Sequence, residues 1–433
     1  MKELEKPKNL YDERGIPRYW FNIVPLLAEY FEPLPPPLGS EEQMSLVAKV
    51  IVPECLKQEM SRDLWIPIPD ELRQMYAWPL KRPRELVRAR ALEKALATPA
   101  EIWVMTEFDS PTGSHKINTA LSQAYFAKQA GKKRLVTETG AGQWGTAVAA
   151  VASMFNLEST IFWVRNVMQW KKNRLEAMQN YGAEVFPSPS DKTKAGRDVL
   201  EKYPNHPGNL GIAISEGVET ASSDQSASYV LGSVLNHVLL HQTIIGLEAK
   251  RQLEENDRYP TIMVSCFGGG SNFGGLILPI LGEMISAGKK DIRFCAYQSA
   301  SYPNLIRGKY KYGEPDHAGL LPKLKMYTLG TDWQGDSIRA GGLQYHGAAP
   351  IISLLRHYGY IEAWAYHKDE KIVLEAGRLF AKTTGWNPAG ESAYAIAGAI
   401  GLALEVKGSR KKRIIVVNVS GRADMEMETY KKE

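Results

Sequence analysis

A lysine in a loop of small residues is the first group in this sequence that could do chemistry. Residues 109–119 form this loop, and Lys116 lies in it between an apolar run at 101–106 and a helical pattern that follows. A lysine can form a Schiff base only after it loses its proton, and burial favours the neutral form. Most loop lysines are solvated surface groups, so the rest of the chain must support this interpretation of Lys116.

A run of three glycines predicts a phosphate site. Gly268, Gly269 and Gly270 follow an apolar run and precede a helical pattern that begins with Ser271 and Asn272. Glycines allow backbone N–H groups to approach a ligand, and a helix N-terminus adds a positive field. A plain tight turn needs only one or two glycines. The segment lacks the Gly-Lys-Ser/Thr ending of a nucleoside triphosphate loop, and a dinucleotide site fits its spacing poorly.

A second glycine-rich segment begins at Glu138, again directly after an apolar run. It continues as Thr139, Gly140, Ala141, Gly142, Gln143 and Trp144. Its amides and polar side chains suit a bound carboxylate. Glu138 could transfer protons if partial burial raises its pKa. The alternatives for Glu138 are a helix cap and a salt-bridge partner.

Two further polar positions complete the set. Ser420 ends the apolar run 414–419, and Glu391 precedes an alanine-rich helical pattern, where it could simply complement the helix dipole. A Schiff-base lysine, a phosphate loop, a carboxylate loop and a nearby acid together predict a site for pyridoxal phosphate and an amino acid. Ser420 is the candidate partner of the pyridine nitrogen. A neutral hydroxyl there favours elimination and replacement at the β carbon over transamination.

The elements that must position these residues are strands and helices in alternation. Short apolar runs separated by longer helical patterns predict βα units with mainly parallel sheets, in which ligands bind at the carboxyl ends of strands. The expected strands are 102–105, 134–137, 160–164, 185–186, 261–266, 292–296 and 414–419. The expected helices are 41–52, 141–155, 171–181, 230–254, 272–287, 370–384 and 392–406. The rest of residues 1–75 is expected to be irregular, with a polyproline-like strap at 31–38.

Composition excludes several classes of function. The 433 residues carry a net charge of +5, with 44% hydrophobic and 23% charged residues, which is ordinary for a soluble protein. The basic run 81–84 is predicted to lie on a solvated helix face and 410–413 in a turn, so no nucleic-acid partner is expected. Three widely spaced cysteines suggest reduced thiols, and eight histidines form no metal motif. We expect a cytoplasmic protein with no membrane span and no bound metal.

Six motifs together resemble the tryptophan synthase β chain, and more closely its β2-type branch with an N-terminal extension. They are GSHKINTA, ETGAGQWG, SPSDKTKAGR, LGSVLNHVLLHQTIIGLEA, GGGSNFGG and AGGLQYHG. The resemblance covers about residues 19–424. It implies an α/β protein of the fold type II pyridoxal phosphate class, with two three-layer α/β domains and the cofactor in the cleft between them.

The resemblance also implies roles for individual residues. Lys116 would bind the cofactor and move the α proton, and Glu138 would act as acid and base at the β position. The implied cofactor contacts are His115, Lys116, Asn118, Gly268, Gly269, Gly270, Ser271, Asn272, Glu391 and Ser420. The implied substrate contacts are Thr139, Gly140, Ala141, Gly142, Gln143 and Trp144. A monovalent cation is a further implied cofactor.

The implied reaction is the condensation of indole with L-serine or O-phosphoserine to give L-tryptophan, in a homodimer. The implied division of the chain is an extension with part of the N-terminal domain at 1–81, a strand segment joining the C-terminal domain at 82–114, the N-terminal domain with a mobile closing region at 115–240, and the C-terminal domain at 241–433. The alternative is a serine or threonine deaminase, or another β-replacing enzyme of this fold with a different nucleophile.

Two departures from the main branch stand near the expected substrate. Trp144 replaces the usual histidine of the carboxylate loop. Gly342-Leu-Gln-Tyr-His346 stands where the main branch has an aspartate that orders the closed state. This second departure argues against the usual closure switch and against activation by an α subunit.

Overall fold

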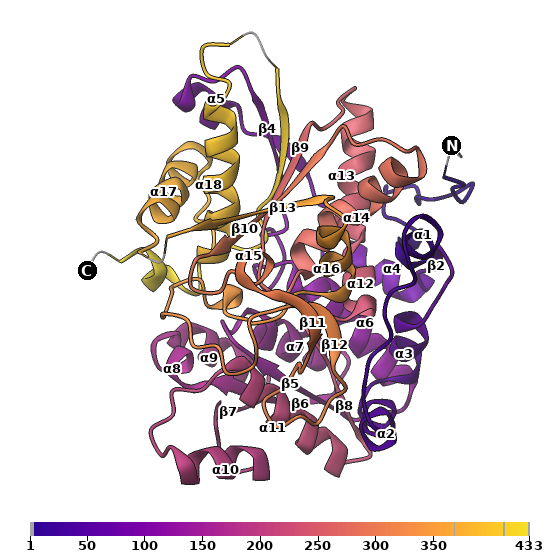
Figure 1. The fold of residues 1–433 in the computed structure, drawn as a ribbon, viewed down its shortest axis with the longest axis vertical. Helices are drawn as coiled ribbons and strands as arrows, with labels where there is room; N and C mark the ends of the chain where they lie inside the picture. The colour runs from indigo at the N-terminus through magenta and orange to yellow at the C-terminus, as the bar shows by residue number, and fades with distance from the viewer. Residues whose placement is uncertain (1–3, 368, 410–411, 432–433) are drawn as a thin grey trace.

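Two parallel sheets, each covered by helices, form the framework of the molecule (Figure 1). The computed structural model describes residues 4–367, 369–409 and 412–431. Each sheet lies in its own half of the view in Figure 1, and the chain passes between the halves more than once. This arrangement places the carboxyl ends of strands from both sheets around a common centre.

The smaller sheet contains four parallel strands in the order β7-β6-β5-β8. Its strands are β5 (Arg134–Thr139), β6 (Glu158–Val164), β7 (Glu184–Ser188) and β8 (Ala227–Tyr229). The helices of this half are α6 (Lys116–Gln129), α7 (Gln143–Met154), α8 (Arg165–Trp170), α9 (Lys172–Asn180), α10 (Lys194–Lys202) and α11 (Leu210–Ser223). Helix α7, with α6 and α9 beside it, and helix α11, with α10 beside it, both pack on β5 and β6. The alanine-rich α7 is buried along most of its length, as expected of a helix enclosed by other elements.

The larger sheet has six strands in the order β13-β10-β9-β14-β4-β3. They are β3 (Leu86–Arg88), β4 (Glu101–Met105), β9 (Ile262–Cys266), β10 (Arg293–Ser299), β13 (Ile361–Tyr366) and β14 (Ile414–Asn418). All neighbours are parallel except β3, which runs antiparallel to β4 at one edge. The helices around it are α5 (Arg90–Leu96), α13 (Ile244–Glu255), α14 (Ser271–Ser286), α17 (Lys371–Thr384) and α18 (Gly390–Leu404).

The remaining elements are short. They are β1 (Tyr19–Phe21), α1 (Val24–Tyr30), α2 (Glu41–Val50), α3 (Pro53–Glu59), β2 (Trp65–Pro67), α4 (Asp70–Ala77), α12 (Asn236–Gln242), α15 (Asn304–Arg307), β11 (Lys309–Gly313), β12 (Leu324–Thr328), η1 (Gly341–Leu343), α16 (Pro350–His357) and η2 (Met427–Tyr430). Helix α2 begins at a capping box in which Ser40 and Gln43 bond each other's backbone. The Gln43 amide also donates to the Gly319 and Leu321 carbonyls, which ties the N-terminal segment to the loop before β12.

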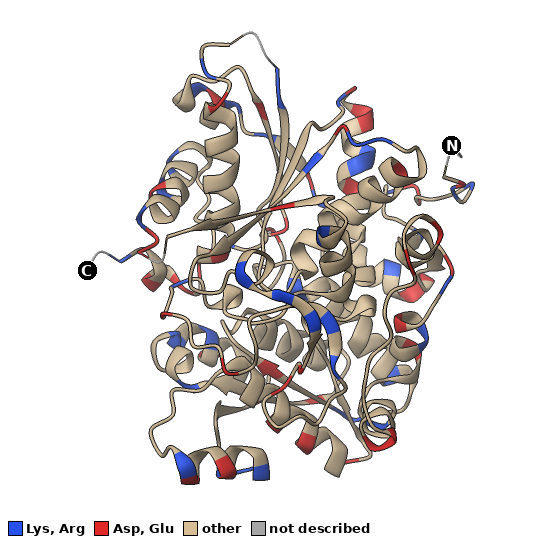
Figure 2. Cartoon of the chain, viewed as in Figure 1, with Lys and Arg blue, Asp and Glu red and all other residues tan. Residues whose placement is uncertain are grey.

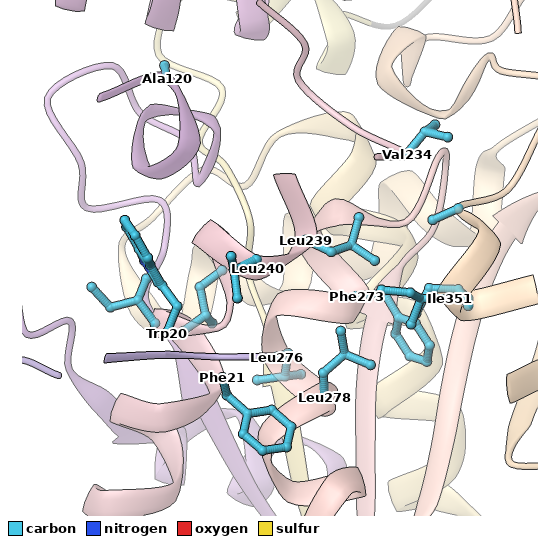
Figure 3. Packing of buried hydrophobic residues seen from close by; sticks show 14 of the residues in the cluster. Trp20, Phe21, Ala120, Val234, Leu239, Leu240, Phe273, Leu276, Leu278 and Ile351 are labelled. Atoms are coloured by element: carbon cyan, nitrogen blue, oxygen red, sulfur yellow. The ribbon is translucent and has the colours of Figure 1, made fainter. Parts of the chain in front are cut away.

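The expectation of an irregular N-terminal segment is wrong in part. The described part of residues 1–75 contains two strands and three helices besides α2. Trp20 and Phe21 are buried in the largest hydrophobic cluster, near Leu240 of α12 and Leu278 of α14 (Figure 3). Burial of these aromatic side chains orders a segment whose own periodicity is weak.

Two other local predictions are corrected. The expected helix at 230–254 is a loop at 230–235 followed by α12 and α13, which meet at Thr243. The basic run at 81–84 does not lie on a solvated helix face, because Arg82 and Arg84 are buried and the next residues form β3. A sequence pattern cannot reveal that buried carboxylates from distant segments face Arg82.

Charged residues lie mainly on the outer helices and loops, with both signs interspersed (Figure 2). In this view β11 and β12 carry blue segments, from Lys309, Lys311 and Lys325, whereas the strands of the two larger sheets are mostly tan. No helix within the described ranges is both long enough and apolar enough to cross a membrane.

Candidate active site

A cavity of about 210 Å³ lies where strand ends of the two sheets meet. Strand β5 of the smaller sheet leads into the segment at 138–144, and β9 and β14 of the larger sheet lead into the glycine loop and Ser420. The predicted residues that line the cavity are His115, Lys116, Glu138, Thr139, Gly140, Ala141, Gln143, Trp144, Gly268, Gly269, Gly270, Ser271, Asn272, Glu391 and Ser420. The fold therefore brings together predicted residues that are up to 305 positions apart in the chain, His115 and Ser420.

Lys116 is the first residue of α6, and its side chain faces the cavity. Its Nζ donates to the Gly232 carbonyl at 2.5 Å and lies 3.4 Å from the Ser271 hydroxyl. Burial lowers the pKa of Lys116 to about 8, although Glu138, Cys266 and Glu391 act in the opposite direction. At pH 7 an amine with this pKa is neutral in roughly a tenth of the molecules, far more often than an ordinary lysine, and a nucleophile or base must be neutral.

His115 precedes Lys116 and is held between the two halves of the site. Its backbone N–H donates to the Ser420 carbonyl at 2.8 Å, and its Nε2 lies 3.4 Å from the Ser271 hydroxyl. Burial, reinforced by the charge of Lys116, lowers the pKa of His115 to about 3. The imidazole is therefore neutral and can serve as a hydrogen-bonding group beside the glycine loop.

Glu138 lies near the end of β5 and is buried. Burial raises the pKa of Glu138 to about 7, even though a hydrogen bond from Tyr229 and the charge of Lys116 lower it. A carboxyl group with this pKa can both give and accept a proton near neutral pH. The environment of Glu138 is thus that of an acid/base group.

The segment after Glu138 is fixed by its own side chains. The Thr139 hydroxyl accepts from the N–H groups of Gly142 and Gly145 at 3.2 and 3.1 Å. The Gln143 amide donates to Glu391 at 2.9 Å and to Glu426 at 3.1 Å. Gly142 belongs to the predicted set but does not line the cavity, because it lies against Trp163 and Arg174 with a φ of +89°.

Glu426 anchors this segment to the C-terminal part of the chain. Its carboxylate is buried and accepts from Lys171 at 2.7 Å and from Arg174 at 3.0 Å. Burial alone would raise the pKa of Glu426, but the two cations outweigh it and lower the pKa to about 2. The C-terminal segment thereby holds α9 and the loop after β5 in one arrangement.

Trp144 fills the wall next to Lys116. Its Nε1 donates to the Thr137 hydroxyl at 2.6 Å. A Cβ on Gly232 would come within 2.5 Å of the Trp144 ring. The indole therefore packs directly on the backbone of Gly232, whose carbonyl accepts a hydrogen bond from Lys116. Trp144 therefore shapes the cavity with its ring, while its Nε1–H is already bonded to Thr137.

The glycine loop between β9 and α14, the predicted phosphate site, is closely packed against neighbouring segments. Gly270 has a φ of +120°, which only glycine adopts easily. A Cβ on Gly268 would meet the Gly342 carbonyl at 2.5 Å, and one on Gly269 would meet the Ser233 hydroxyl at 2.5 Å. The loop leads directly into the N-terminus of the sixteen-residue helix α14.

Asn272 and Ser420 occupy the far side of the loop. The Asn272 amide donates to the Ser265 hydroxyl at 2.5 Å and so turns back toward β9. The Ser420 hydroxyl lies 3.1 Å from the Ser392 hydroxyl and 3.5 Å from the Cys266 sulfur. Ser420 therefore presents a neutral hydroxyl to the cavity.

Asn118 is the one predicted cofactor contact that lies away from the cavity. It is fully buried, and its amide donates to Glu107 and Gln242 while its carbonyl accepts from Arg82. Gln242 in turn donates to the His115 carbonyl at 3.2 Å. The structure thus places Asn118 where it supports the start of α6.

Many cavity residues have no counterpart among the predicted site residues. They include Leu56 and Glu59 of α3, and Tyr229, Gly232 and Ser233 at or just after the end of β8. The signal that could have found the last two is a Gly-Ser pair directly after a short strand. Within the described parts of the chain, no group of three or more histidine, cysteine, aspartate or glutamate side chains could hold a metal ion.

Comparison with known proteins shows the family of this chain. The family model described as "Pyridoxal-phosphate dependent enzyme" matches residues 77–421. The chain is 47% identical over 427 residues to the tryptophan synthase beta chain of Thermococcus gammatolerans, covering 98% of this chain and 95% of that protein. It is 48% identical over 419 residues to tryptophan synthase beta chain 2 of Pyrococcus abyssi, covering 96% and 93%.

Solved structures share the fold at low sequence identity. A fungal L-serine ammonia-lyase from Rhizomucor miehei matches with a TM-score of 0.57 and 18% identity, over 81% of this chain and 96% of that chain. Threonine deaminase isoform 2 from Solanum lycopersicum matches with a TM-score of 0.59 and 16% identity, over 84% and 92%. These two likenesses concern the fold alone, the type II pyridoxal phosphate fold expected from the sequence.

Proposed function

We infer that this chain, which belongs to the tryptophan synthase beta chains of the pyridoxal-phosphate dependent enzyme family, makes L-tryptophan from indole and a serine-type donor by replacement at the β carbon. The observation that carries this inference is the presence, in one cavity, of a buried lysine and a buried glutamate. Lys116 has a pKa lowered to about 8 and Glu138 has a pKa raised to about 7. Each group is therefore suited to move a proton near neutral pH.

The residues around the cavity fit pyridoxal phosphate. Gly268, Gly269 and Gly270 line the cavity and lead into the N-terminus of α14, where backbone N–H groups and the helix field favour a phosphate. Lys116 would hold the cofactor covalently, His115 and Ser271 would flank its phosphate, and Ser420 would face its pyridine nitrogen. When bound, the cofactor supplies an electron-withdrawing system that acidifies the α proton and allows a β substituent to leave.

Lys116 removes the α proton of the amino acid in this proposal. Its Nζ is held by the Gly232 carbonyl and lies close to Ser271, so it has a defined position at the end of α6. Burial keeps a useful fraction of the amine neutral, which it must be in order to accept a proton. The same residue later returns a proton to the α carbon.

Glu138 gives a proton to the β leaving group and later accepts one as indole adds. A hydroxide is a poor leaving group, so a protonated carboxyl is needed when the donor is L-serine. A phosphate leaves with less need of an acid, so O-phosphoserine remains a second possible donor. Trp144 and residues 342–345 of the segment at 342–346 border the cavity, and we propose that Trp144 and this segment select between the two donors.

The segment from Thr139 to Trp144 would bind the substrate carboxylate through its backbone. Gln143 keeps this backbone in place by bridging Glu391 and Glu426. We further propose a cytoplasmic homodimer that works without an α subunit, with a monovalent cation as an accessory ligand. Family resemblance supports the homodimer and the cation, and the altered segment at 342–346 supports independence from an α subunit.

The visible absorption spectrum of the purified protein tests the proposal. The spectrum should show bound cofactor, change when L-serine or O-phosphoserine is added, and change again when indole is added with formation of L-tryptophan. Lys116→Ala should abolish both changes. Pyruvate without tryptophan in the presence of indole would instead indicate a deaminase, and an unresponsive spectrum would exclude both reactions.

A further inference from the structure

Glu138 depends on a tyrosine from a neighbouring strand for its orientation. We propose that Tyr229 is a positioning residue for Glu138, whose phenol holds one carboxylate oxygen so that the other faces the reacting atoms. This inference deepens the proposed function and rests on it for the identity of the reaction. The contact itself is a hydrogen bond from the Tyr229 hydroxyl to Oε2 of Glu138, inside the cavity.

The Tyr229 ring is fixed before any substrate binds. Tyr229 ends β8, and its backbone is paired with Val136 of β5, two residues before Glu138. Its side chain is 1% exposed. A Cβ on Gly217 of α11 would come within 2.8 Å of the ring. Because Gly217 has no side chain, the Tyr229 ring packs directly against the backbone of α11. A ring held in this way delivers its hydroxyl to one place.

The neighbouring hydroxyl of Thr137 cannot replace Tyr229. Thr137 Oγ1 lies 3.5 Å from Oε2 of Glu138 but only 2.6 Å from the Val230 carbonyl. It also accepts the Trp144 Nε1–H at 2.6 Å. Because a hydroxyl has one proton, the shorter bond to Val230 uses it. Tyr229 is therefore the effective hydroxyl donor to this carboxylate.

The hydrogen bond from Tyr229 changes the pKa of Glu138 in a definite direction. The ionisable groups that face Glu138 are Lys116 from α6, Tyr229 from β8 and Tyr345 after η1. Burial raises the pKa of Glu138 to about 7, and the Tyr229 hydrogen bond lowers it. A hydrogen bond to the charged form stabilises that form, so removal of the hydroxyl should raise the pKa further.

The test is a titration of the Glu138 carboxyl in the cofactor-free protein. Infrared difference spectroscopy against Glu138→Gln identifies the band of the protonated carboxyl, which is then followed with pH. In Tyr229→Phe the midpoint should rise by about one pH unit, the size expected for loss of a hydrogen bond to a charged group. Tyr345→Phe is the matched control, because Tyr345 borders the same cavity but donates to the Pro315 carbonyl at 3.1 Å. Its midpoint should equal that of the wild type.

A second variant covers the case in which Tyr229→Phe does not fold. A fluorinated tyrosine at position 229 keeps the ring and hydroxyl but is a stronger acid, so the Glu138 midpoint should fall. A midpoint that moves in neither variant, or that moves equally in Tyr345→Phe, would overturn the proposal.

Turnover provides a separate readout. The limb of the kcat profile that Glu138→Gln removes should shift in Tyr229→Phe by the same amount as the midpoint, with KM for the amino acid unchanged. An equal loss of kcat at every pH would mean that Tyr229 is only structural. A protein that shows the infrared shift but makes no tryptophan would contradict the proposed function and leave the role of Tyr229 intact. Tryptophan formation without the infrared shift would support the proposed function and contradict the role of Tyr229.

Discussion

Replacement of Arg82 by methionine should lower the free energy of unfolding by about 3–5 kcal/mol, the cost of breaking a buried ion pair. Arg82 donates to Glu107 at 2.8 Å and to Glu248 at 2.9 Å, and all three side chains are 0% exposed. The same guanidinium donates to the side-chain Oδ1 of Asn118 at 2.9 Å. Arg82 therefore connects the segment before β3, the end of β4, α6 and α13.

The pH dependence of this loss follows from the two carboxylates. Burial would raise the pKa of Glu107, but Arg82 outweighs it and keeps the pKa lowered, whereas the pKa of Glu248 is raised chiefly by burial. Without the cation both carboxyls should have raised pKa values in the folded protein. A group whose folded pKa exceeds its unfolded value destabilises the fold most at high pH, and protonation relieves this as pH falls. The loss in Arg82→Met should thus be larger at about pH 8 than at about pH 5.

Urea unfolding of the cofactor-free protein at both pH values measures the effect, with the slope of the transition compared between variants. Arg293→Met is the control, because Arg293 makes a two-bonded contact with Glu362 in the same sheet, but both side chains are more than a third exposed. That pair should be worth only about 0–1 kcal/mol. Equal losses in the two variants, or a loss in Arg82→Met that grows on acidification, would refute this reasoning.

Three further outcomes are expected at the site. Glu138→Gln should reduce kcat by about 10²–10⁴-fold while leaving cofactor binding, seen in the visible spectrum, unchanged. Gly269→Ala should weaken pyridoxal phosphate binding in equilibrium dialysis, because its Cβ would lie 2.5 Å from the Ser233 hydroxyl; the same change at Gly401 of α18, where the nearest neighbour of a Cβ is the Tyr366 hydroxyl at 3.8 Å, should leave binding unchanged. Glu426→Gln should cost about 3–5 kcal/mol near neutral pH, because Lys171 and Arg174 lose their buried partner. Since the folded pKa of Glu426 is lowered to about 2, its contribution exists above its usual pKa and is lost as pH falls toward 2, so urea unfolding of wild type and variant should converge in acid.

Much of the sheet architecture could be predicted from the sequence because its strands are short apolar runs between helices of ordinary length. The expected strands at 134–137 and 160–164 lie within β5 and β6, and the one at 414–419 overlaps β14. The reactive residues follow such strands, which is why the predicted lysine, glutamate and glycine loop meet in one cavity. For these groups, the residue type and a position after a predicted strand were enough to predict that they share one site.

The short edge strands β3 and β8 escaped prediction for a different reason. Each has three residues, too few for a periodicity to show, and each is fixed by pairing with a longer neighbour, β4 or β5. Arg82 was misinterpreted for a related reason, because its burial depends on Glu107 and Glu248. In all these cases the structure of a segment is decided by residues that are distant in the chain.

The loop at 230–235, which borders the cavity, is another segment whose conformation depends on distant residues. Its sequence favours a helix that continues to residue 254, yet Val234 has a φ of +75°, a strained conformation for a β-branched residue. Bonds from outside hold the loop: Gln123 donates to the Leu231 carbonyl at 2.7 Å, and Glu59 accepts from the N–H groups of Asn236 and His237.

The gain from this strained loop is the Gly232 carbonyl, which lies 2.5 Å from Lys116 Nζ, and the close approach of Ser233 to Gly269. A helix through these residues would use the Gly232 carbonyl for its own hydrogen bond and withdraw it from the lysine. Glu59 belongs to α3, in the N-terminal segment. That segment therefore stabilises the non-helical loop that contacts Lys116, and Glu59 also lines the cavity itself.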